Sequence, residues 1–137
     1  MIGCGEWGKN ILRDLVALGC DVPVVARTDA SIAHAKAGKA SHIANEIGAL
    51  GECDRLVVAT PTALHYSIAS QALTTFPDIP IYVEKPLTND LARVDALAAH
   101  RARIFVMDKW RYHTGVLEVA RLVSDQTFGA LQEFGWE

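Results

Sequence analysis

The chain has 137 residues, 50% hydrophobic and 21% charged, a composition that indicates a packed globular domain and excludes a disordered or low-complexity protein. No apolar run approaches the ~18–20 residues of a membrane span, and no secretory signal is recognisable, so we expect neither a membrane protein nor a secreted one. The formal charge of −3, without a Lys/Arg cluster, argues against nucleic-acid binding. Cys4, Cys20 and Cys53 are widely spaced, which predicts reduced thiols in a cytoplasmic protein and neither a metal site nor a disulfide framework.

The first half of the chain alternates amphipathic and apolar stretches. Its predicted elements are, in chain order, a helix over 7–18, a strand over 22–26, a helix over 30–37, a weak strand over 42–44 and a helical turn over 46–50. Gly19 ends the first helix, and Asp29 is the candidate cap of the second. Pro23 cannot donate to a strand ladder, so it should lie near the start of its strand or on an unpaired side.

The second half shows the same alternation more sharply. The predicted elements are a strand over 56–59, a helix from Thr60 to about residue 73, a strand over 79–83, a helix capped by Thr88 or Asn89, a strand over 104–107, a helix over 114–123 and the opening of a strand over 130–136. Thr60 would cap its helix and Pro61 would take the first helical position. Strands that alternate with helices indicate βαβ units and a parallel sheet.

Both ends of the chain depart from a complete fold of this kind. A doubly wound sheet needs a first strand of about 5–6 residues, and only Met1 and Ile2 precede the first turn. We therefore expect an α/β, Rossmann-like, doubly wound domain over 1–127 with a truncated first strand. Residues 128–137 would begin a C-terminal α/β substrate domain that is otherwise absent.

A glycine-rich turn lies directly before the first predicted helix. Its residues are Gly3, Cys4, Gly5, Glu6, Trp7 and Gly8, which read GxGxxG. In dinucleotide-binding folds the first glycine permits a tight turn, the second lets the backbone approach a pyrophosphate, and the third lets the helix pack on its strand. The pyrophosphate would lie at the free N–H groups of the helix. A glycine turn that merely precedes a helix is the alternative, and the βαβ pattern weighs against it.

The end of the second predicted strand bears on the choice of dinucleotide. The fold usually places an acidic residue about 20 residues after the glycines, where it binds the ribose 2′-hydroxyl. Here Arg27 follows Gly8 by 19 residues, and a guanidinium can bind a 2′-phosphate bidentately while Thr28 adds a hydroxyl. We therefore favour NADP over NAD as the cofactor. In the alternative, Arg27 is a surface arginine and Asp29 binds the ribose of NAD.

A short motif closes the strand over 56–59, at the sheet edge where ligands bind. It consists of Ala59, Thr60, Pro61 and Thr62, and a helix start suffices to explain Thr60 and Pro61. His65 lies one turn into the helix. We interpret His65 as a solvent-facing or core histidine in preference to a catalytic one.

Glu84, Lys85 and Pro86 end the next strand. This order places an ammonium group at the ligand crevice, and Pro86 fixes the backbone there and could form a cis bond with Lys85. A surface ion pair beside a turn is the alternative interpretation.

These motifs occur in one order and at characteristic intervals. They are the glycine turn Gly3–Gly8, the segment Ala59–Thr62 with His65, the segment Glu84–Leu87, the aromatic–arginine segment Trp110–His113 and the segment Phe128–Leu131. In this combination the chain resembles the glucose–fructose oxidoreductase / inositol dehydrogenase family (Gfo/Idh/MocA) of NAD(P)-dependent enzymes. The resemblance covers essentially the whole chain.

The resemblance implies a role for each motif. The glycines cradle the pyrophosphate, Thr60 and Pro61 line the nicotinamide side, and Glu84 contacts the nicotinamide or its ribose. Lys85 is the implied catalytic residue, which hydrogen-bonds the substrate hydroxyl that loses hydride. Together the motifs and the resemblance predict a cofactor site made of Gly3, Cys4, Gly5, Glu6, Trp7, Gly8, Arg27, Thr28, Ala59, Thr60, Pro61, Thr62, His65, Glu84, Lys85, Trp110 and Arg111.

The expected function is the cofactor-binding portion of an oxidoreductase that transfers hydride to or from a sugar, cyclitol or related hydroxy or oxo substrate. In the family the general acid/base comes from the second domain, so we expect this chain to be catalytically incompetent by itself. The resemblance also implies a homo-oligomer for the full-length parent. A non-catalytic nucleotide-binding or ligand-sensing module is the alternative; it needs the glycines but has no use for Lys85 at the crevice. A scaffold that keeps the fold without the cofactor is a third possibility.

Overall fold

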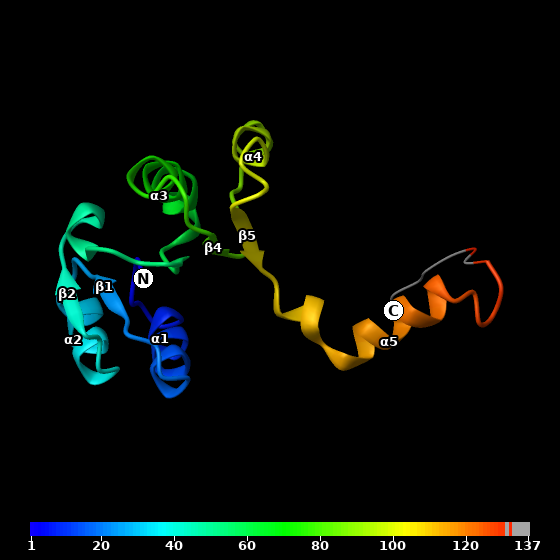
Figure 1. Ribbon diagram of the computed structural model, residues 1–137, viewed down its shortest axis with the longest axis horizontal. Coiled ribbons are helices and arrows are strands. Elements are labelled where there is room, and N and C mark those ends of the chain that lie inside the picture. The colour runs from blue at the N-terminus through cyan, green and yellow to red at the C-terminus, as the bar shows by residue number, and fades with distance from the viewer. Residues whose placement is uncertain (131, 133–137) are drawn as a thin grey trace. The chain divides into compact units, whose positions relative to one another are not determined.

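The computed structural model describes residues 1–130 and 132 (Figure 1). It divides into two compact units, and the first, Met1–Met107, contains five short strands and four α-helices. The strands are β1 (Pro23–Val25), β2 (His42–Ala44), β3 (Leu56–Val58), β4 (Ile81–Glu84) and β5 (Ile104–Met107). The helices are α1 (Gly8–Ala17), α2 (Asp29–Ala37), α3 (Thr62–Thr75) and α4 (Leu91–Ala98), with a 3₁₀ turn, η1 (Ile47–Leu50), between β2 and β3.

All strand pairs are parallel, and Ile2 joins the two groups that they form. β1 pairs with β2, while β3, β4 and β5 pair in that order. Ile2 makes a parallel bridge to Val25 on one side and to Val58 on the other. It therefore holds the place of a first strand between β1 and β3. The expected doubly wound parallel arrangement with a very short first strand is confirmed.

Met1 is itself part of this bridge, because its carbonyl accepts a hydrogen bond of 2.8 Å from the Val25 N–H. The residue is only 5% exposed, and its amino group donates to the Pro23 carbonyl at 2.6 Å. Burial lowers the pKa of this amine from 8.0 to about 6, and the charge of Cys53 opposes the shift. Pro23 thus lies beside Met1, and it begins its strand as expected.

The core lies on both faces of the strands. Alternate residues of β3 divide between two apolar clusters: Leu56 and Val58 join the cluster that contains α3 residues, and Val57 packs on the cluster that contains Leu12 of α1. Figure 1 shows the corresponding layers, with α3 and α4 on one side of the strands and α1 and α2 on the other. Because the strands are parallel, their carboxyl ends meet at one edge, where the predicted site residues follow them.

Three expected helix starts are wrong in detail. Thr28, rather than Asp29, caps α2, where it forms a reciprocal capping box with Ser31. Asp90, rather than Thr88 or Asn89, caps α4 by accepting from the Ala92 N–H. Pro61 holds the N-cap position of α3, so the Thr60 side chain does not cap it.

The second unit begins at Asp108 and contains η2 (Lys109–Tyr112) and α5 (Thr114–Ser124). His113 caps α5 by accepting from the Gly115 N–H, and Arg121 pairs with Glu118 and Asp125 along the helix. The strand expected over 130–136 falls almost wholly outside the described residues, and the domain boundary expected at residue 127 stays a prediction. None of the helices in the described part of the chain is long and apolar enough to cross a membrane.

Candidate functional site

The glycine turn is held against the end of β3 by its first glycine. Gly3 has φ +88°, a conformation that side chains other than glycine rarely adopt. A Cβ at Gly3 would lie 2.6 Å from the Ala59 carbonyl oxygen and 2.9 Å from the Thr60 side chain. Only glycine therefore lets the turn approach the Ala59–Thr60 segment this closely.

The other two glycines differ in their surroundings. A Cβ at Gly8 would lie 2.9 Å from the Gly3 carbonyl oxygen, so this glycine allows α1 to pack on the turn. A Cβ at Gly5 would have nothing within 4 Å among the described residues, so the backbone there faces open space. No described side chain caps α1, and its first turn contains no acidic residue. This arrangement fits a bound pyrophosphate, which needs close backbone approach and free N–H groups.

Trp7 connects the glycine turn to the end of β4. Its indole N–H donates a hydrogen bond of 2.8 Å to Oε1 of Glu84, 77 residues away in sequence. The other carboxylate oxygen of Glu84 accepts from the Lys85 backbone N–H at 3.2 Å. Two of the predicted motifs thus meet at the carboxyl edge, and Lys85 is the exposed residue that follows.

His65 connects the ends of β3 and β4. It is 1% exposed, and its Nε2 and Nδ1 each lie 2.8 Å from a carbonyl oxygen, that of Thr60 and that of Pro86 respectively. The interpretation of His65 as a core histidine matches this position. The peptide bond between Lys85 and Pro86 is cis, as the sequence allowed. Thr60 Oγ1 is buried and has no partner among the described residues.

Arg27 follows β1, and the terminal nitrogens of its guanidinium make no hydrogen bond or ion pair within the described part of the chain. Its Nε donates to the Asn45 carbonyl at 3.0 Å, which orients the side chain. Thr28 Oγ1 accepts from the Ser31 N–H and lies 3.0 Å from Ser31 Oγ. The Thr28 hydroxyl therefore serves the start of α2, and its expected contact with a 2′-phosphate stays a prediction.

Glu6 carries a negative charge in the glycine turn, and two basic side chains face it. Lys9 forms an ion pair with Glu6, and His34 Nε2 lies 3.5 Å from Glu6 Oε1. The hydrogen bond and charge of Lys9 lower the pKa of Glu6, with His34 adding to the effect. His34 Nδ1 also lies 3.0 Å from the Cys4 carbonyl oxygen. Sequence reasoning missed His34 and Lys9, because nothing in the periodicity of α2 places His34 beside the turn.

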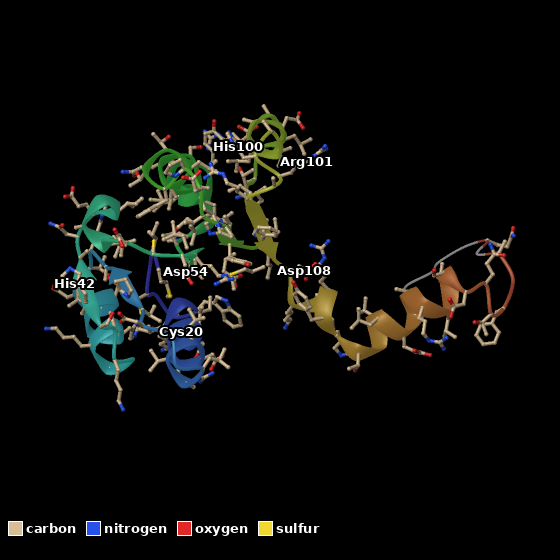
Figure 2. The ribbon with its side chains drawn as sticks, viewed as in Figure 1. Cys20, His42, Asp54, His100, Arg101 and Asp108 are labelled. Atoms are coloured by element: carbon tan, nitrogen blue, oxygen red, sulfur yellow. The ribbon has the colours of Figure 1, made fainter. Side chains whose placement is uncertain are left out.

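Cys4 is fully buried, and burial raises the pKa of its thiol, so the side chain packs as a neutral group behind the turn. All three cysteines are free; Cys20 is exposed just after α1 (Figure 2). Within residues 1–130 and 132, no group of three His, Cys, Asp or Glu side chains could hold a metal ion. The remaining predicted site residues, Trp110 and Arg111, belong to the second unit, so their contact with a cofactor stays a prediction.

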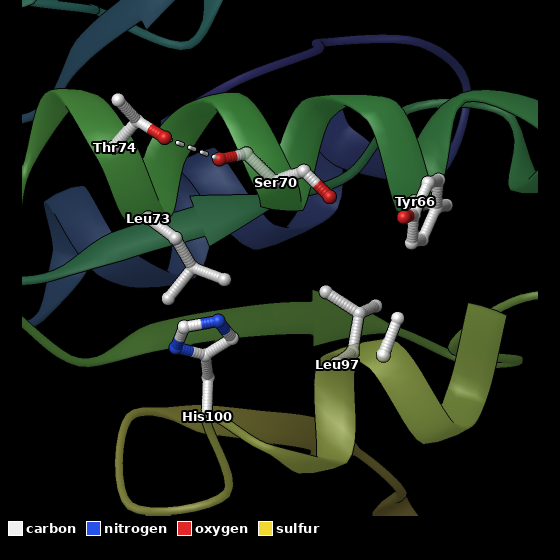
Figure 3. Close-up of a pocket in the computed structure, with 7 residues that line it drawn as sticks. Tyr66, Ser70, Leu73, Thr74, Leu97 and His100 are labelled. Atoms are coloured by element: carbon white, nitrogen blue, oxygen red, sulfur yellow. Dashed lines mark hydrogen bonds between the residues drawn. The ribbon is translucent and has the colours of Figure 1, made fainter.

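A separate cavity of about 370 Å³ lies between α3 and α4. Figure 3 shows Leu73 of α3 and His100, which follows α4, pointing toward one another across it. Its lining residues are Tyr66, Ser70, Leu73, Thr74, Ala96, Leu97 and His100. None of them belongs to the glycine turn or to the segments that end β3 and β4, so this cavity is not the candidate site.

Comparison with known proteins decides the family. Residues 1–107 match the model of the Gfo/Idh/MocA oxidoreductases, which is described as an oxidoreductase family with an NAD-binding Rossmann fold. The chain belongs to this family. The matched region is the same as the first unit of the structure, and it contains every predicted site residue except Trp110 and Arg111.

Two curated Gfo/Idh/MocA relatives are more than 30% identical to the chain. A protein of Amycolatopsis mediterranei (strain S699), assigned as an oxidoreductase subunit of UDP-kanosamine synthase, is 34% identical over an alignment of 104 positions, gaps included, which covers 72% of this chain and 28% of that protein. The inositol 2-dehydrogenase of Pseudarthrobacter chlorophenolicus is 32% identical over an alignment of 143 positions, gaps included, which covers 96% of this chain and 42% of the enzyme. The chain thus spans less than half the length of either relative.

Solved structures of the family share the fold. The WlbA dehydrogenase from Bordetella pertussis, solved in complex with NADH and UDP-GlcNAcA, aligns with a TM-score of 0.78 at 22% identity. The alignment covers 93% of this chain and 42% of WlbA. At this identity the likeness shows the fold alone.

Proposed function

We propose that the chain binds a nicotinamide dinucleotide at the carboxyl edge of its sheet and is the cofactor-binding part of a sugar or cyclitol oxidoreductase. One observation carries this proposal: the backbone at Gly5 is open, within a turn that is held on both sides. At Gly3 the turn packs closely against Ala59 and Thr60, and the Trp7 side chain hydrogen-bonds to Glu84. The pyrophosphate would lie along the turn and the first N–H groups of α1. The names of the relatives, an inositol dehydrogenase and an oxidoreductase of UDP-sugar metabolism, support a polyhydroxylated substrate.

The dinucleotide would supply the chemistry of hydride transfer, and the chain would orient the reactants. Arg27 marks the side of the adenosine ribose, so the nicotinamide half would extend over the ends of β3 and β4. Glu84, held by Trp7, is then placed to bind the nicotinamide ribose. Lys85 would donate a hydrogen bond to the substrate hydroxyl and favour the alkoxide character that develops as hydride leaves.

The general acid/base is proposed to come from a second, substrate-binding domain. His65 is buried with both ring nitrogens facing carbonyl oxygens, so it is badly placed to take a proton from a substrate. The chain by itself is therefore proposed to bind cofactor without turnover. We further propose that the full-length enzyme is cytoplasmic and homo-oligomeric. The three free cysteines agree with the proposed cytoplasmic location.

Replacement of Arg27 by aspartate tests the proposed cofactor and its preferred form. The unaltered chain should bind NADPH more tightly than NADH, because the free end of the Arg27 guanidinium can pair with a 2′-phosphate. In the variant, the new carboxylate repels the phosphate and can accept from a 2′-hydroxyl. We expect NADPH affinity to fall by at least about tenfold, or ~1.4 kcal/mol, and the preference to reverse. Titration followed by nicotinamide fluorescence measures both.

The matched control is Arg101→Asp, which makes the same charge change at an exposed residue before β5, away from the carboxyl edge (Figure 2). This variant should keep the preference of the unaltered chain. If the unaltered chain prefers NADH, Arg27 does not select the cofactor, and Asp29 becomes the better ribose partner. If it binds neither dinucleotide, the proposed function is wrong.

A further inference from the structure

The predicted nicotinamide side of the site is formed by two loops, which follow β3 and β4. Beyond the β3–β4 ladder, no backbone hydrogen bond among the described residues joins these two loops. One loop begins at Thr60 after β3, and the other contains Lys85 and Pro86 after β4. The β3–β4 ladder ends where Val58 pairs with Val83. Beyond it Ala59 donates to the Ile2 carbonyl and Glu84 pairs with Met107, so among the described residues the connection between the two loops themselves is left to side chains. The position of Lys85 therefore depends on whatever fixes the loop after β4.

His65 is the side chain that spans the two loops. It projects from the first turn of α3, is almost completely buried, and lies between the carbonyl oxygens of Thr60 and Pro86 at 2.8 Å from each. A neutral imidazole has one N–H and donates to one carbonyl at a time, whereas a ring protonated on both nitrogens donates to both. In either form the ring fills the space between the loops and binds at least one of them.

We propose that His65 is a positioning residue for the nicotinamide half of the site. His65 acts by binding the carbonyls of Thr60 and Pro86, and these contacts fix the loop that begins at Thr60 and the loop that contains Lys85. His65 does not need to touch the dinucleotide. The proposal rests on the proposed dinucleotide binding. It distinguishes the two halves of the ligand: the pyrophosphate and adenosine contacts are proposed at the glycine turn and at Arg27, whereas the hydrogen-bond partners of His65 are the carbonyls of Thr60 and Pro86.

Three variants test the proposal in the 137-residue chain. His65→Phe keeps a ring of similar size and removes both nitrogens. His65→Asn places an amide N–H near the position of Nδ1, facing Pro86, and His65→Gln places one near Nε2, facing Thr60. Affinities for NADPH, NADH and ADP are measured by titration well below the unfolding temperature of each variant, which circular dichroism determines. ADP probes the adenosine and phosphate contacts without the nicotinamide.

We expect His65→Phe to bind NADPH and NADH about tenfold more weakly and ADP within about twofold of the unaltered chain. At least one of the amide variants should recover part of the lost affinity, because it restores one hydrogen bond. Ser67→Ala is the control, since Ser67 is an exposed residue of the same helix whose hydroxyl, among the described residues, bonds only to the Leu64 carbonyl. It should leave all three affinities unchanged.

Two results overturn the proposal while the proposed function stands. In the first, His65→Phe binds NADPH as tightly as the unaltered chain. In the second, the variants lose NADPH and ADP affinity in equal proportion, as a purely structural role would produce. If His65→Phe does not fold, the comparison of NADPH with ADP in the Asn and Gln variants decides. If the unaltered chain binds no dinucleotide, the proposed function fails, and this inference fails with it.

Discussion

Replacement of Gly5 by valine is expected to weaken dinucleotide binding by at least about tenfold while the stability of the chain stays nearly unchanged. A Cβ at Gly5 meets nothing within 4 Å among the described residues, and Gly5 is not among the glycines of positive φ. The branched side chain is therefore tolerated by the fold, with a change of less than about 0.5 kcal/mol in the free energy of unfolding. It would instead occupy the space through which the pyrophosphate must approach the backbone.

Gly48→Val is the matched control for this prediction. Gly48 is an exposed glycine of η1 and lies outside the candidate site. A Cβ at Gly48 would likewise meet nothing within 4 Å in the part of the chain that the structure describes. Calorimetric titration with NADPH and NADH, together with thermal unfolding of both variants, measures the outcome. Equal affinities of the Gly5 variant and the unaltered chain would remove the glycine turn from the site. Gly3 does not offer so clean a test, because its Cβ would clash with the Ala59 backbone.

Replacement of Lys85 by alanine is expected to have the largest effect on turnover. In a chain that includes the proposed substrate domain, the loss of an ammonium aimed at the developing alkoxide should lower kcat on the order of 10²–10³-fold. Dinucleotide affinity should stay within about threefold, because the proposed role of Lys85 is toward the substrate and not the cofactor. Reduction of NADP⁺ or NAD⁺ with a polyol substrate, followed at the absorbance of the reduced nicotinamide, measures kcat and KM.

Lys36→Ala controls for the loss of a lysine, since Lys36 is an exposed residue near the end of α2. This variant should retain full turnover. A Lys85→Ala enzyme that keeps more than half of its kcat would contradict the assigned role. So would polyol-dependent turnover by residues 1–137 alone, because the general acid/base is proposed to lie in the second domain.

The sequence was most informative where local periodicity decides the structure. The apolar run over 104–107 became β5 with the same bounds, and the amphipathic pattern over 114–123 became α5 with one residue more. The expected strands over 22–26 and 79–83 were displaced or shortened at their ends. Strand ends depend on which neighbours are available for pairing, and propensity does not encode that information.

The helix caps show a second limit of local reasoning. Thr28 and Asp29 are both good capping residues, as are Thr88, Asn89 and Asp90, so composition alone could not choose among neighbours. The choice was made by geometry: Thr28 has Ser31 three residues later and can form the reciprocal bonds of a capping box. Thr60 precedes a proline that takes the N-cap position itself, which left its hydroxyl without the expected partner.

The residues that gather at the candidate site were predictable, but their mutual contacts were not. The bond from Trp7 to Glu84 joins residues 77 apart, and the contacts of His65 require the ends of β3 and β4 to be adjacent. Both follow from strand order, which the alternation of strands and helices restricts without specifying. The place of Ile2 between β1 and β3 was, by contrast, expected, since only Met1 and Ile2 were available for the truncated first strand.

The central claim is that the dinucleotide binds at the carboxyl edge, between the glycine turn and the ends of β3 and β4. Two-dimensional ¹H–¹⁵N NMR of the 137-residue chain during titration with NADP⁺ tests it most directly. The proposed site predicts saturable shifts of the Gly5 and Trp7 amides, of the Trp7 indole N–H and of the Lys85 amide. Shifts that instead concentrate at Ser70, Leu97 and His100, around the cavity between α3 and α4, would contradict the claim, as would a spectrum that NADP⁺ leaves unchanged.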